Sequence, residues 1–363
     1  MPKTILILSN HYITIYAFRR ELVARLCAAG HRVYISSPYD ERNRYFEDLG
    51  CTMIDTPMSR RGMNPTEDLK LVGQYKKMMQ ELKPDIIFSY TIKPNIYGTM
   101  ASNALGLKQV CNITGTGATF LRESALSKLV RLLYKVSIRK CYKVFFQNTG
   151  DKDYFVRHGM VKDNWALLPG SGVNLQENSL AELPDTGEIR FLFAGRAMAV
   201  KGVDEYLECA RVIRELLPNT CFYIAGFVEE EKYQKRIADY EALGVVKYLG
   251  FQDDMKPLLR KCHCLILPSL GGEGVPNVLL EAAATGRACI ASNINGSVDV
   301  VEDGVTGYIF EKGNARDLID KVERFLCLSY EEKRQMGLRG RDKVVREFDR
   351  EIVIARYMKE IEE

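Results

Sequence analysis

The chain has 363 residues, of which 46% are hydrophobic and 27% are charged, and its formal net charge is +4. These values exclude a disordered or fibrous protein, and the length exceeds what one hydrophobic core usually holds, so two domains are expected. No apolar run approaches the roughly 18 residues of a membrane-spanning helix, and the short run at 4–9 follows a single Lys3, which does not make a signal peptide. Ten cysteines without framework spacing are typical of a reducing compartment, so we expect a cytoplasmic protein.

Strand-like and helix-like segments alternate along the chain. The first half predicts strands at 5–9, 33–37 and 86–89 and helices at 15–29, 65–82 and 97–104. After the turn-rich, acidic segment 174–187, a second series predicts strands at 189–195, 220–225, 246–250, 263–268 and 288–291. Such alternation is typical of parallel sheets covered by helices on both faces. The sequence therefore predicts an α/β protein with two doubly wound, Rossmann-like domains that face a cleft.

The stretch 269–281 contains a Gly-rich turn that joins a predicted strand to a predicted helix, and it carries two glutamates separated by seven residues, Glu273 and Glu281. Pro276 suits the first turn of a helix, where its missing N–H would have no partner. The amides of residues 277–279 would then point out of the helix, with the positive end of its dipole behind them. The turn predicts a diphosphate site, although similar turns occur in proteins that bind nothing there.

Two cations follow another predicted strand. Arg196 comes directly after the strand, and Lys201 lies five residues further on. A guanidinium and an ammonium both bind phosphate oxygens well, although a single Lys or Arg is more commonly a solvated surface cation. In doubly wound sheets, ligands bind beyond the carboxyl ends of strands. Two cations and a helix N-terminus at such ends favour the phosphate site.

These two motifs resemble those of the retaining glycosyltransferases of family 4, which have the GT-B fold, and the likeness covers nearly the whole chain. The Glu-x7-Glu pattern of that family matches Glu273 and Glu281. The resemblance implies that Glu273 touches the donor sugar's hydroxyls near the reacting carbon and that Glu281 accepts hydrogen bonds from the ribose. It implies catalytic roles for Glu273, Lys201 and Arg196. The implied donor-binding residues are Arg196, Lys201, Gly274, Val275, Pro276, Asn277, Val278 and Glu281.

The resemblance also implies the domain plan. An acceptor-binding domain would comprise residues 1–172, and a nucleotide-sugar-binding domain would comprise 173–345. The last segment, 346–363, would return to the first domain, with a helix near 349–361.

Four segments of the first half narrow the resemblance. Residues 89–98, 112–120, 144–148 and 168–173 are similar to bacterial transferases that extend a sugar on a polyprenyl-diphosphate lipid, of the N-acetylgalactosaminyl, galactosyl and galacturonosyl types. The implied reaction moves a hexose or N-acetylhexosamine from a UDP-sugar co-substrate to a lipid-linked saccharide, without cofactor or metal, in the assembly of capsule, exopolysaccharide, lipopolysaccharide or N-glycan. Two alternatives stay open: a sugar-nucleotide 2-epimerase, and an inactive partner subunit of a polysaccharide assembly complex.

Several residues of the first half are candidates for the acceptor side. His11 follows the first predicted strand, and many family members have a His in mid-domain where this chain has Tyr90 and Lys93. A lone His is more commonly a packing residue, and a Gly-Thr-Gly run is more commonly an ordinary turn. The candidate acceptor-side residues are His11, Lys93, Asn112, Gly115, Thr116 and Gly117.

Charge is divided unevenly between the halves. Up to Leu180 the chain has 25 Lys and Arg and 15 Asp and Glu, a net charge of +10, so the remainder carries −6. The excess is densest in 121–143, where apolar residues recur at helical spacing among cations. Such a helix either lies on an anionic membrane, here the inner face of the cell membrane, or packs on its own domain with a solvated basic face. No nucleic-acid-binding module accompanies it.

Two short motifs invite a metal interpretation. Cys262-His263-Cys264 enters an apolar strand, where adjacent residues do not build a tetrahedral site by themselves. Asp151-Lys152-Asp153 matches the Asp-x-Asp signature by which the other large transferase fold holds a divalent ion, but its place after a turn predicts a helix cap. No metal site is expected, because the phosphate-site cations and helix amides would neutralise a diphosphate.

Overall fold

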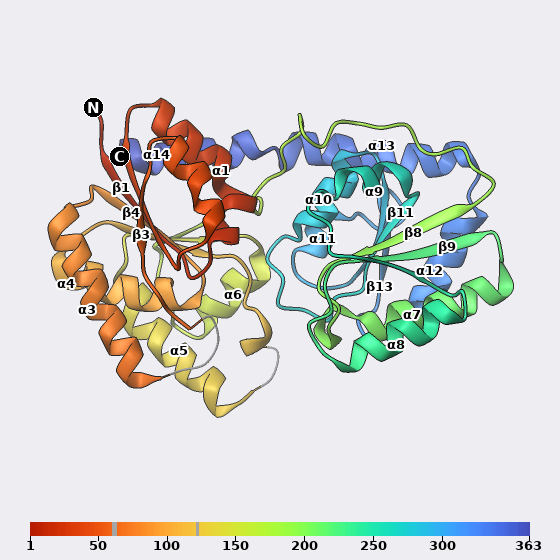
Figure 1. Ribbon diagram of the computed structural model, residues 1–363, viewed down its shortest axis with the longest axis horizontal. Helices are drawn as coiled ribbons and strands as arrows, with labels where there is room; N and C mark the ends of the chain where they lie inside the picture. Colours follow the sequence, from red (N-terminus) through yellow and green to blue (C-terminus); the bar gives the residue numbers. More distant parts are fainter. Residues whose placement is uncertain (60–63, 121–122) are drawn as a thin grey trace. The chain divides into compact units, whose positions relative to one another are not determined.

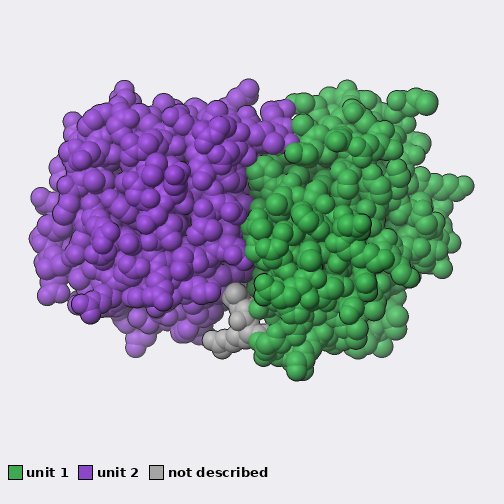
Figure 2. Space-filling view, turned by 180° about the vertical axis from the view of Figure 1, so that it is seen from behind, with its two compact units in different colours: residues 1–171, 353–363 green, residues 172–352 purple. Residues whose placement is uncertain are grey.

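The computed structural model describes residues 1–59, 64–120 and 123–363. The chain divides into two compact units (Figure 2). Unit 1 comprises residues 1–171 and 353–363, and unit 2 comprises residues 172–352. Each unit is built on one parallel sheet with helices on both faces (Figure 1).

Unit 1 contains a seven-stranded parallel sheet in the order β3-β2-β1-β4-β5-β6-β7. Strand order reverses between β1 and β4, which is the switch point where doubly wound sheets bind ligands. The strands are β1 Thr4–Leu8, β2 Arg32–Ser37, β3 Thr52–Asp55, β4 Ile86–Tyr90, β5 Gln109–Ile113, β6 Lys143–Phe146 and β7 Trp165–Leu167. The helices are α1 Tyr12–Ala28, α2 Arg44–Asp48, α3 Pro65–Leu82, α4 Thr99–Leu105, α5 Ala125–Ser137 and α6 Thr149–Arg157.

Successive residues of β1 face opposite sides of this sheet. Ile5 and Ile7 join a buried cluster with residues of α1 and of the C-terminal helix α14 (Arg350–Glu362). Leu6 and Leu8 join a second buried cluster with residues of α3 and α5. Figure 1 shows these two sets of helices on opposite faces of the sheet. A strand covered on both faces must be apolar throughout, which explains the unbroken run of β1.

Unit 2 contains a six-stranded parallel sheet in the order β10-β9-β8-β11-β12-β13. The strands are β8 Ile189–Ala194, β9 Thr220–Ala225, β10 Lys247–Gly250, β11 Cys264–Leu267, β12 Ala288–Ser292 and β13 Gly307–Phe310. The helices are α7 Val203–Leu216, α8 Lys232–Ala242, α9 Lys256–Lys261, α10 Asn277–Ala284, α11 Ser297–Val300, α12 Ala315–Cys327 and α13 Tyr330–Glu347. Residues of α7, α8 and α12 pack on one face, and residues of α9 and α10 pack on the other.

Three predicted helices differ from the observed ones. Helix α1 begins at Tyr12 rather than residue 15, because the ring Nδ1 of His11 accepts a hydrogen bond from the Ile13 amide and caps the first turn. The helix predicted at 97–104 begins as a π-helical turn, Pro94–Gly98, and continues as α4. The segment 121–143 is not one helix: Leu121 and Arg122 lie outside the described residues, α5 ends at Ser137, and β6 begins at Lys143.

The C-terminal segment joins unit 1 at residue 353, whereas the expected return began at 346. Residues 346–352 remain with unit 2 because Val173 bonds to the chain on both sides of Asp349. Its amide donates to the Phe348 carbonyl at 2.9 Å, and its carbonyl accepts from the Arg350 amide at 3.1 Å. Within unit 1, the Tyr357 ring packs edge-on against Phe88. The return therefore takes place inside α14.

Candidate functional site

The loops that follow β8 and β11 meet at the carboxyl edge of the unit 2 sheet, because these strands are neighbours. The Leu270 amide of one loop donates to the Val200 carbonyl of the other at 2.8 Å. Gly202 closes the first loop with φ of +72°, and a Cβ there would lie 2.0 Å from the Pro268 carbonyl oxygen. This position therefore requires glycine both for its left-handed backbone and for the close approach.

The two loops bring Lys201 and Glu273 into an ion pair. The Lys201 ammonium bonds to Glu273 Oε1, and both side chains are largely buried, with 19% and 17% of their surface exposed. The Ser269 hydroxyl donates to the same carboxylate oxygen at 3.0 Å. Sequence reasoning predicted the lysine and the glutamate but missed Ser269, which directly follows the predicted strand. The carboxylate is thus held by a cation and a hydroxyl at the carboxyl edge of the sheet, the edge at which doubly wound sheets generally bind ligands.

Arg196 lies at the same edge, in the loop after β8 that also carries Lys201. Its Nη1 donates to Glu229 Oε2 at 2.7 Å. Glu229 follows β9, the neighbour of β8, and the Ala197 amide donates to the Phe227 carbonyl at 2.9 Å, which holds the two loops together. Sequence reasoning missed Glu229 because no motif surrounds it. The sequence offered one indication of its role, its position shortly after the predicted strand at 220–225.

Helix α10 begins at Asn277, and Pro276 occupies the N-cap position with φ of −67° rather than the first turn. The expectation that three amides point out of the helix is wrong for Leu279, whose amide donates to the Pro276 carbonyl at 3.1 Å. The side-chain oxygen of Asn277 is buried and has no hydrogen-bond partner within the described part of the chain. Gly274 and Val275 are buried just before the helix.

Glu281 lies one turn into α10. Burial raises the pKa of its carboxyl to about 7 from the ordinary 4.5, and the charges of Arg350 and Lys256 oppose this shift only in part. A carboxyl with this pKa changes its charge near neutral pH, so its ability to accept hydrogen bonds as an anion depends on pH.

The acceptor-side candidates all lie in unit 1. The Lys93 ammonium is buried and pairs with Asp68 at 2.9 Å. Asn112 is buried as well: its amide nitrogen donates to the Ser89 carbonyl, and its oxygen accepts from the Tyr357 hydroxyl. Both polar ends of the Asn112 side chain thus have partners inside unit 1, and Tyr90 is likewise fully buried. His11 is the cap of α1, and Gly115, Thr116 and Gly117 form a half-buried loop after β5.

The residues considered for metal binding have other partners. His263 is buried with Nδ1 accepting from the Arg190 amide at 3.0 Å and Nε2 next to the Pro184 carbonyl, and burial lowers its pKa to about 4. The cap of α6 is Asn148, and Asp151 lies in the first turn, bonded back to it. Across 1–59, 64–120 and 123–363, no cluster of three or more His, Cys, Asp or Glu is placed to hold a metal.

Two family models match the chain. "Glycosyl transferase 4-like" matches residues 4–148, and "Glycosyl transferases group 1" matches residues 176–343. The N-acetyl-alpha-D-glucosaminyl L-malate synthase of Bacillus anthracis is 35% identical over 361 residues, which cover 93% of this chain and 90% of that protein. The chain belongs to the family-4, group 1 glycosyltransferases. It is thus an enzyme of the class expected from its sequence.

A second relative is named for a diphospho-undecaprenol substrate. The N,N'-diacetylbacillosaminyl-diphospho-undecaprenol alpha-1,3-N-acetylgalactosaminyltransferase of Campylobacter jejuni is 28% identical over 372 residues, covering 97% of this chain and 96% of that protein. The crystal structure of Anabaena HepE with UDP and glucose is 16% identical, with a TM-score of 0.80 and 99% coverage of each chain. The GT-B fold class expected from the sequence is confirmed. In the described residues of this family member, no helix is long and apolar enough to cross a membrane.

Proposed function

We propose that this glycosyltransferase is a retaining enzyme that moves a hexose or N-acetylhexosamine from a UDP-sugar to a hydroxyl of a lipid-linked saccharide, in the assembly of a bacterial surface polysaccharide or glycan. The observation that carries the donor half is the ion pair of Lys201 and Glu273 at the carboxyl edge, next to the start of α10. The Campylobacter relative, named for a diphospho-undecaprenol substrate, supports the acceptor half.

The diphosphate of the donor is assigned to Arg196, Lys201 and the loop that leads into α10, with Glu281 on the ribose. Both cations contact carboxylates, so each side chain is directed at a position where an anionic oxygen can lie. Fixed cations stabilise the charge that grows on a departing diphosphate, and no metal ion is required for that.

The proposed step is a front-face displacement. The acceptor oxygen bonds to the anomeric carbon as the bond from that carbon to the diphosphate breaks, on the same face of the sugar. The departing phosphate oxygen takes the proton of the acceptor hydroxyl, so no enzyme carboxylate becomes glycosylated. Glu273 orients the sugar hydroxyls, and its contacts to Lys201 and Ser269 keep it in place.

Helix α5 is assigned to the membrane face of the enzyme. Four large apolar side chains at helical spacing are 43–56% exposed on it, Leu126, Leu129, Leu132 and Val136. Exposed cations lie along and just beyond the helix, Lys128, Lys135, Arg139 and Lys140. An amphipathic helix of this composition binds at the surface of an anionic bilayer. We therefore place the enzyme on the inner face of the cell membrane, where a lipid-linked acceptor is within reach.

A second candidate acceptor is a small hydroxy acid. The Bacillus anthracis relative is named for L-malate and shares more identity with this chain, 35%, than the Campylobacter relative does, 28%. In this alternative the same donor site serves a water-soluble acceptor, and the exposed apolar face of α5 has no part in the reaction.

One experiment separates these functions. The purified protein is incubated with UDP-glucose, UDP-galactose, UDP-N-acetylglucosamine or UDP-N-acetylgalactosamine, and with a polyprenyl-diphosphate saccharide, L-malate or no acceptor. A labelled lipid product supports the proposal, and labelled malate supports the second candidate. Conversion of the nucleotide sugar without acceptor indicates an epimerase. No product, together with no stabilisation by UDP, indicates an inactive partner subunit.

A further inference from the structure

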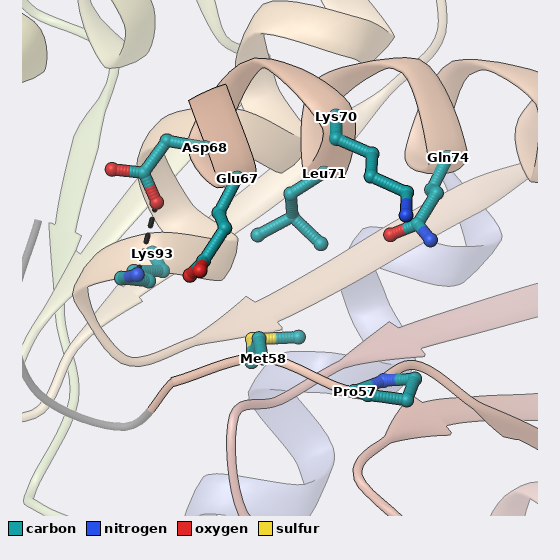
Figure 3. A pocket seen from close by; sticks show the side chains of 8 residues that line it. All are labelled: Pro57, Met58, Glu67, Asp68, Lys70, Leu71, Gln74 and Lys93. Atoms are coloured by element: carbon teal, nitrogen blue, oxygen red, sulfur yellow. Dashed lines mark hydrogen bonds and ion pairs between the residues drawn. The ribbon is translucent and has the colours of Figure 1, made fainter. Parts of the chain in front are cut away.

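A pocket of about 220 Å³ opens in unit 1 at the carboxyl edge of its sheet (Figure 3). Pro57 and Met58, in the loop after β3, line one side, and Lys93, just after β4, lines another. The remaining lining residues come from the first three turns of α3, Glu67, Asp68, Lys70, Leu71 and Gln74. The donor motifs lie entirely in unit 2 and contribute nothing to it.

A buried ion pair gives this pocket a rigid wall. The Lys93 ammonium bonds to Asp68 Oδ1 at 2.9 Å, and the Tyr97 hydroxyl donates to Asp68 Oδ2 at 2.8 Å. Lys93 is 9% exposed and Asp68 is 6% exposed, so surrounding protein atoms fix the positions of both side chains. Within the described part of the chain, this pair is the one hydrogen bond of the ammonium. A preformed polar wall of this kind costs little entropy when a ligand binds.

The pocket lining carries no net charge. Two carboxylates, Glu67 and Asp68, are balanced by two ammonium groups, Lys70 and Lys93. An anion such as a phosphate or a carboxylate would meet two carboxylates there as well as two ammonium groups. The lining instead offers hydrogen-bond acceptors on its carboxylates, donors on its ammonium groups, and both on the Gln74 amide. Such a set suits ligand hydroxyl groups, because each hydroxyl both donates and accepts hydrogen bonds.

Size and apolar contacts narrow the ligand further. The volume is below the range of roughly 300–1,000 Å³ that drug-sized ligands occupy, so it suits a single small ring. Leu71, Met58 and Pro57 add an apolar surface beside the polar groups, as Figure 3 shows. Such a surface packs against the C–H groups of a sugar ring, while the polar groups bind its hydroxyls.

We propose that this pocket binds one uncharged sugar ring of the acceptor saccharide, held by Glu67, Lys70 and Gln74 beside the fixed pair of Asp68 and Lys93. The inference rests on the proposed function, since it assigns a ring of the acceptor. The pocket would also select among acceptors. A saccharide with a neutral ring at this position would be accepted, and a saccharide with a uronic acid there would be rejected.

The first test measures binding without turnover. Saturation-transfer NMR is recorded with methyl glycosides of galactose, N-acetylglucosamine, N-acetylgalactosamine and glucuronic acid. The variant Gln74→Trp blocks the pocket from an exposed position of α3, and Gln80→Trp, also exposed on α3 but outside the pocket, is the control. The expected result is a signal from a neutral glycoside that falls at least fivefold in Gln74→Trp alone. A signal from the glucuronoside instead, or no signal that depends on Gln74, overturns the proposal.

The second test separates this proposal from the proposed function. Thermal stabilisation by UDP should be the same in both variants, because the donor residues are in unit 2. With an active acceptor, Gln74→Trp should raise the acceptor KM at least tenfold and leave the UDP-sugar KM unchanged, whereas Gln80→Trp changes neither. An unchanged acceptor KM in Gln74→Trp rejects the pocket while the transferase assignment stands. If the wild type neither transfers a sugar nor is stabilised by UDP, the proposed function fails, and the NMR result alone tests the pocket.

Discussion

Arg196 is bonded to Glu229 across two neighbouring strands of unit 2, with 2.7 Å between Nη1 and Oε2. The carboxylate thus contacts the guanidinium that the proposed function assigns to the donor diphosphate. A carboxylate beside a phosphate site repels an incoming anion, so Glu229 should oppose donor binding at Arg196.

Removing this competing charge should strengthen UDP binding. Glu229→Gln keeps the size of the side chain and is expected to lower the Kd of UDP about three- to tenfold, or up to about 1.4 kcal/mol. Isothermal titration measures the effect, with Glu231→Gln as an exposed control that faces no assigned cation. A weaker affinity in Glu229→Gln would show that the carboxylate positions Arg196 for the phosphate, and the competition argument would then be wrong.

Replacement of Glu273 should reduce transfer with little effect on folding. In Glu273→Ala the sugar loses an orienting group and Lys201 loses its partner, so kcat is expected to fall at least a hundredfold, about 2.7 kcal/mol of transition-state free energy. The melting temperature should fall by only a few degrees, because Lys201 keeps 19% of its surface exposed and water can solvate it once its partner is removed. Glu323→Ala, exposed on α12, is the matched control. Near-normal turnover in Glu273→Ala would remove this residue from the site.

Glu281 should make both stability and UDP binding depend on pH. Its pKa in the folded chain, about 7, lies above its ordinary 4.5, so the folded state binds its proton more tightly than the unfolded state does. The free energy of unfolding therefore falls as pH rises from about 4.5 to 7, by at most roughly 3 kcal/mol. Glu281→Gln should be more stable than the wild type at pH 8 and similar at pH 4.5, as chemical denaturation measures.

The same titration affects the ribose contact. UDP affinity should rise between pH 6 and 8 in the wild type as Glu281 becomes an acceptor-only carboxylate. Titration of UDP itself changes the affinity of the wild type and of Glu281→Gln equally. The difference between their pH profiles therefore gives the effect of the Glu281 carboxyl group alone. Parallel pH profiles in the two proteins would exclude Glu281 from the ribose site.

The apolar face of α5 should control binding to anionic vesicles. Leu129→Glu combined with Leu132→Glu places two charges on this face and is expected to lower binding to phosphatidylglycerol vesicles more than tenfold in a flotation assay. The matched control, Leu216→Glu with Leu243→Glu, changes two leucines of unit 2 that are 59% and 75% exposed. Equal loss in both double variants, or no binding by the wild type, would remove α5 from the membrane proposal.

Gly202 should be required for the donor loops. Gly202→Ala combines a left-handed backbone with a Cβ 2.0 Å from the Pro268 carbonyl oxygen, so we expect a loss of more than about 2 kcal/mol in stability and of UDP binding. Gly244→Ala has a similar φ, +70°, but its Cβ meets nothing within 4 Å. The stability of this control should fall only by the cost of the left-handed backbone, about 1–2 kcal/mol, and its UDP binding should be unchanged. Equal losses in the two variants would contradict the role assigned to the close approach.

The limits of local patterns are visible in the helices. The helix predicted at 65–82 agrees with α3 at both ends, where the structure shows Asn64 capping its start and Pro65 in its first turn. It placed the start of α1 three residues late, because His11 is an uncommon cap. The segment 121–143 has one helical pattern but contains α5 and the start of a strand, since Lys143 pairs with Val110 of a neighbouring strand.

The sequence by itself determined the fold class, because that class depends on alternating strand and helix periods. It also determined the family, and the likeness to that family singles out Lys201, Glu273 and Glu281, because the family motifs are spacings within single loops. Only the tertiary structure decided which residues meet. Ser269 reaches Glu273, Glu229 reaches Arg196 and Asp68 reaches Lys93. The last two pairs join loops or helices far apart in the chain, and sheet order and the packing of α3 set their distances, which no local pattern records.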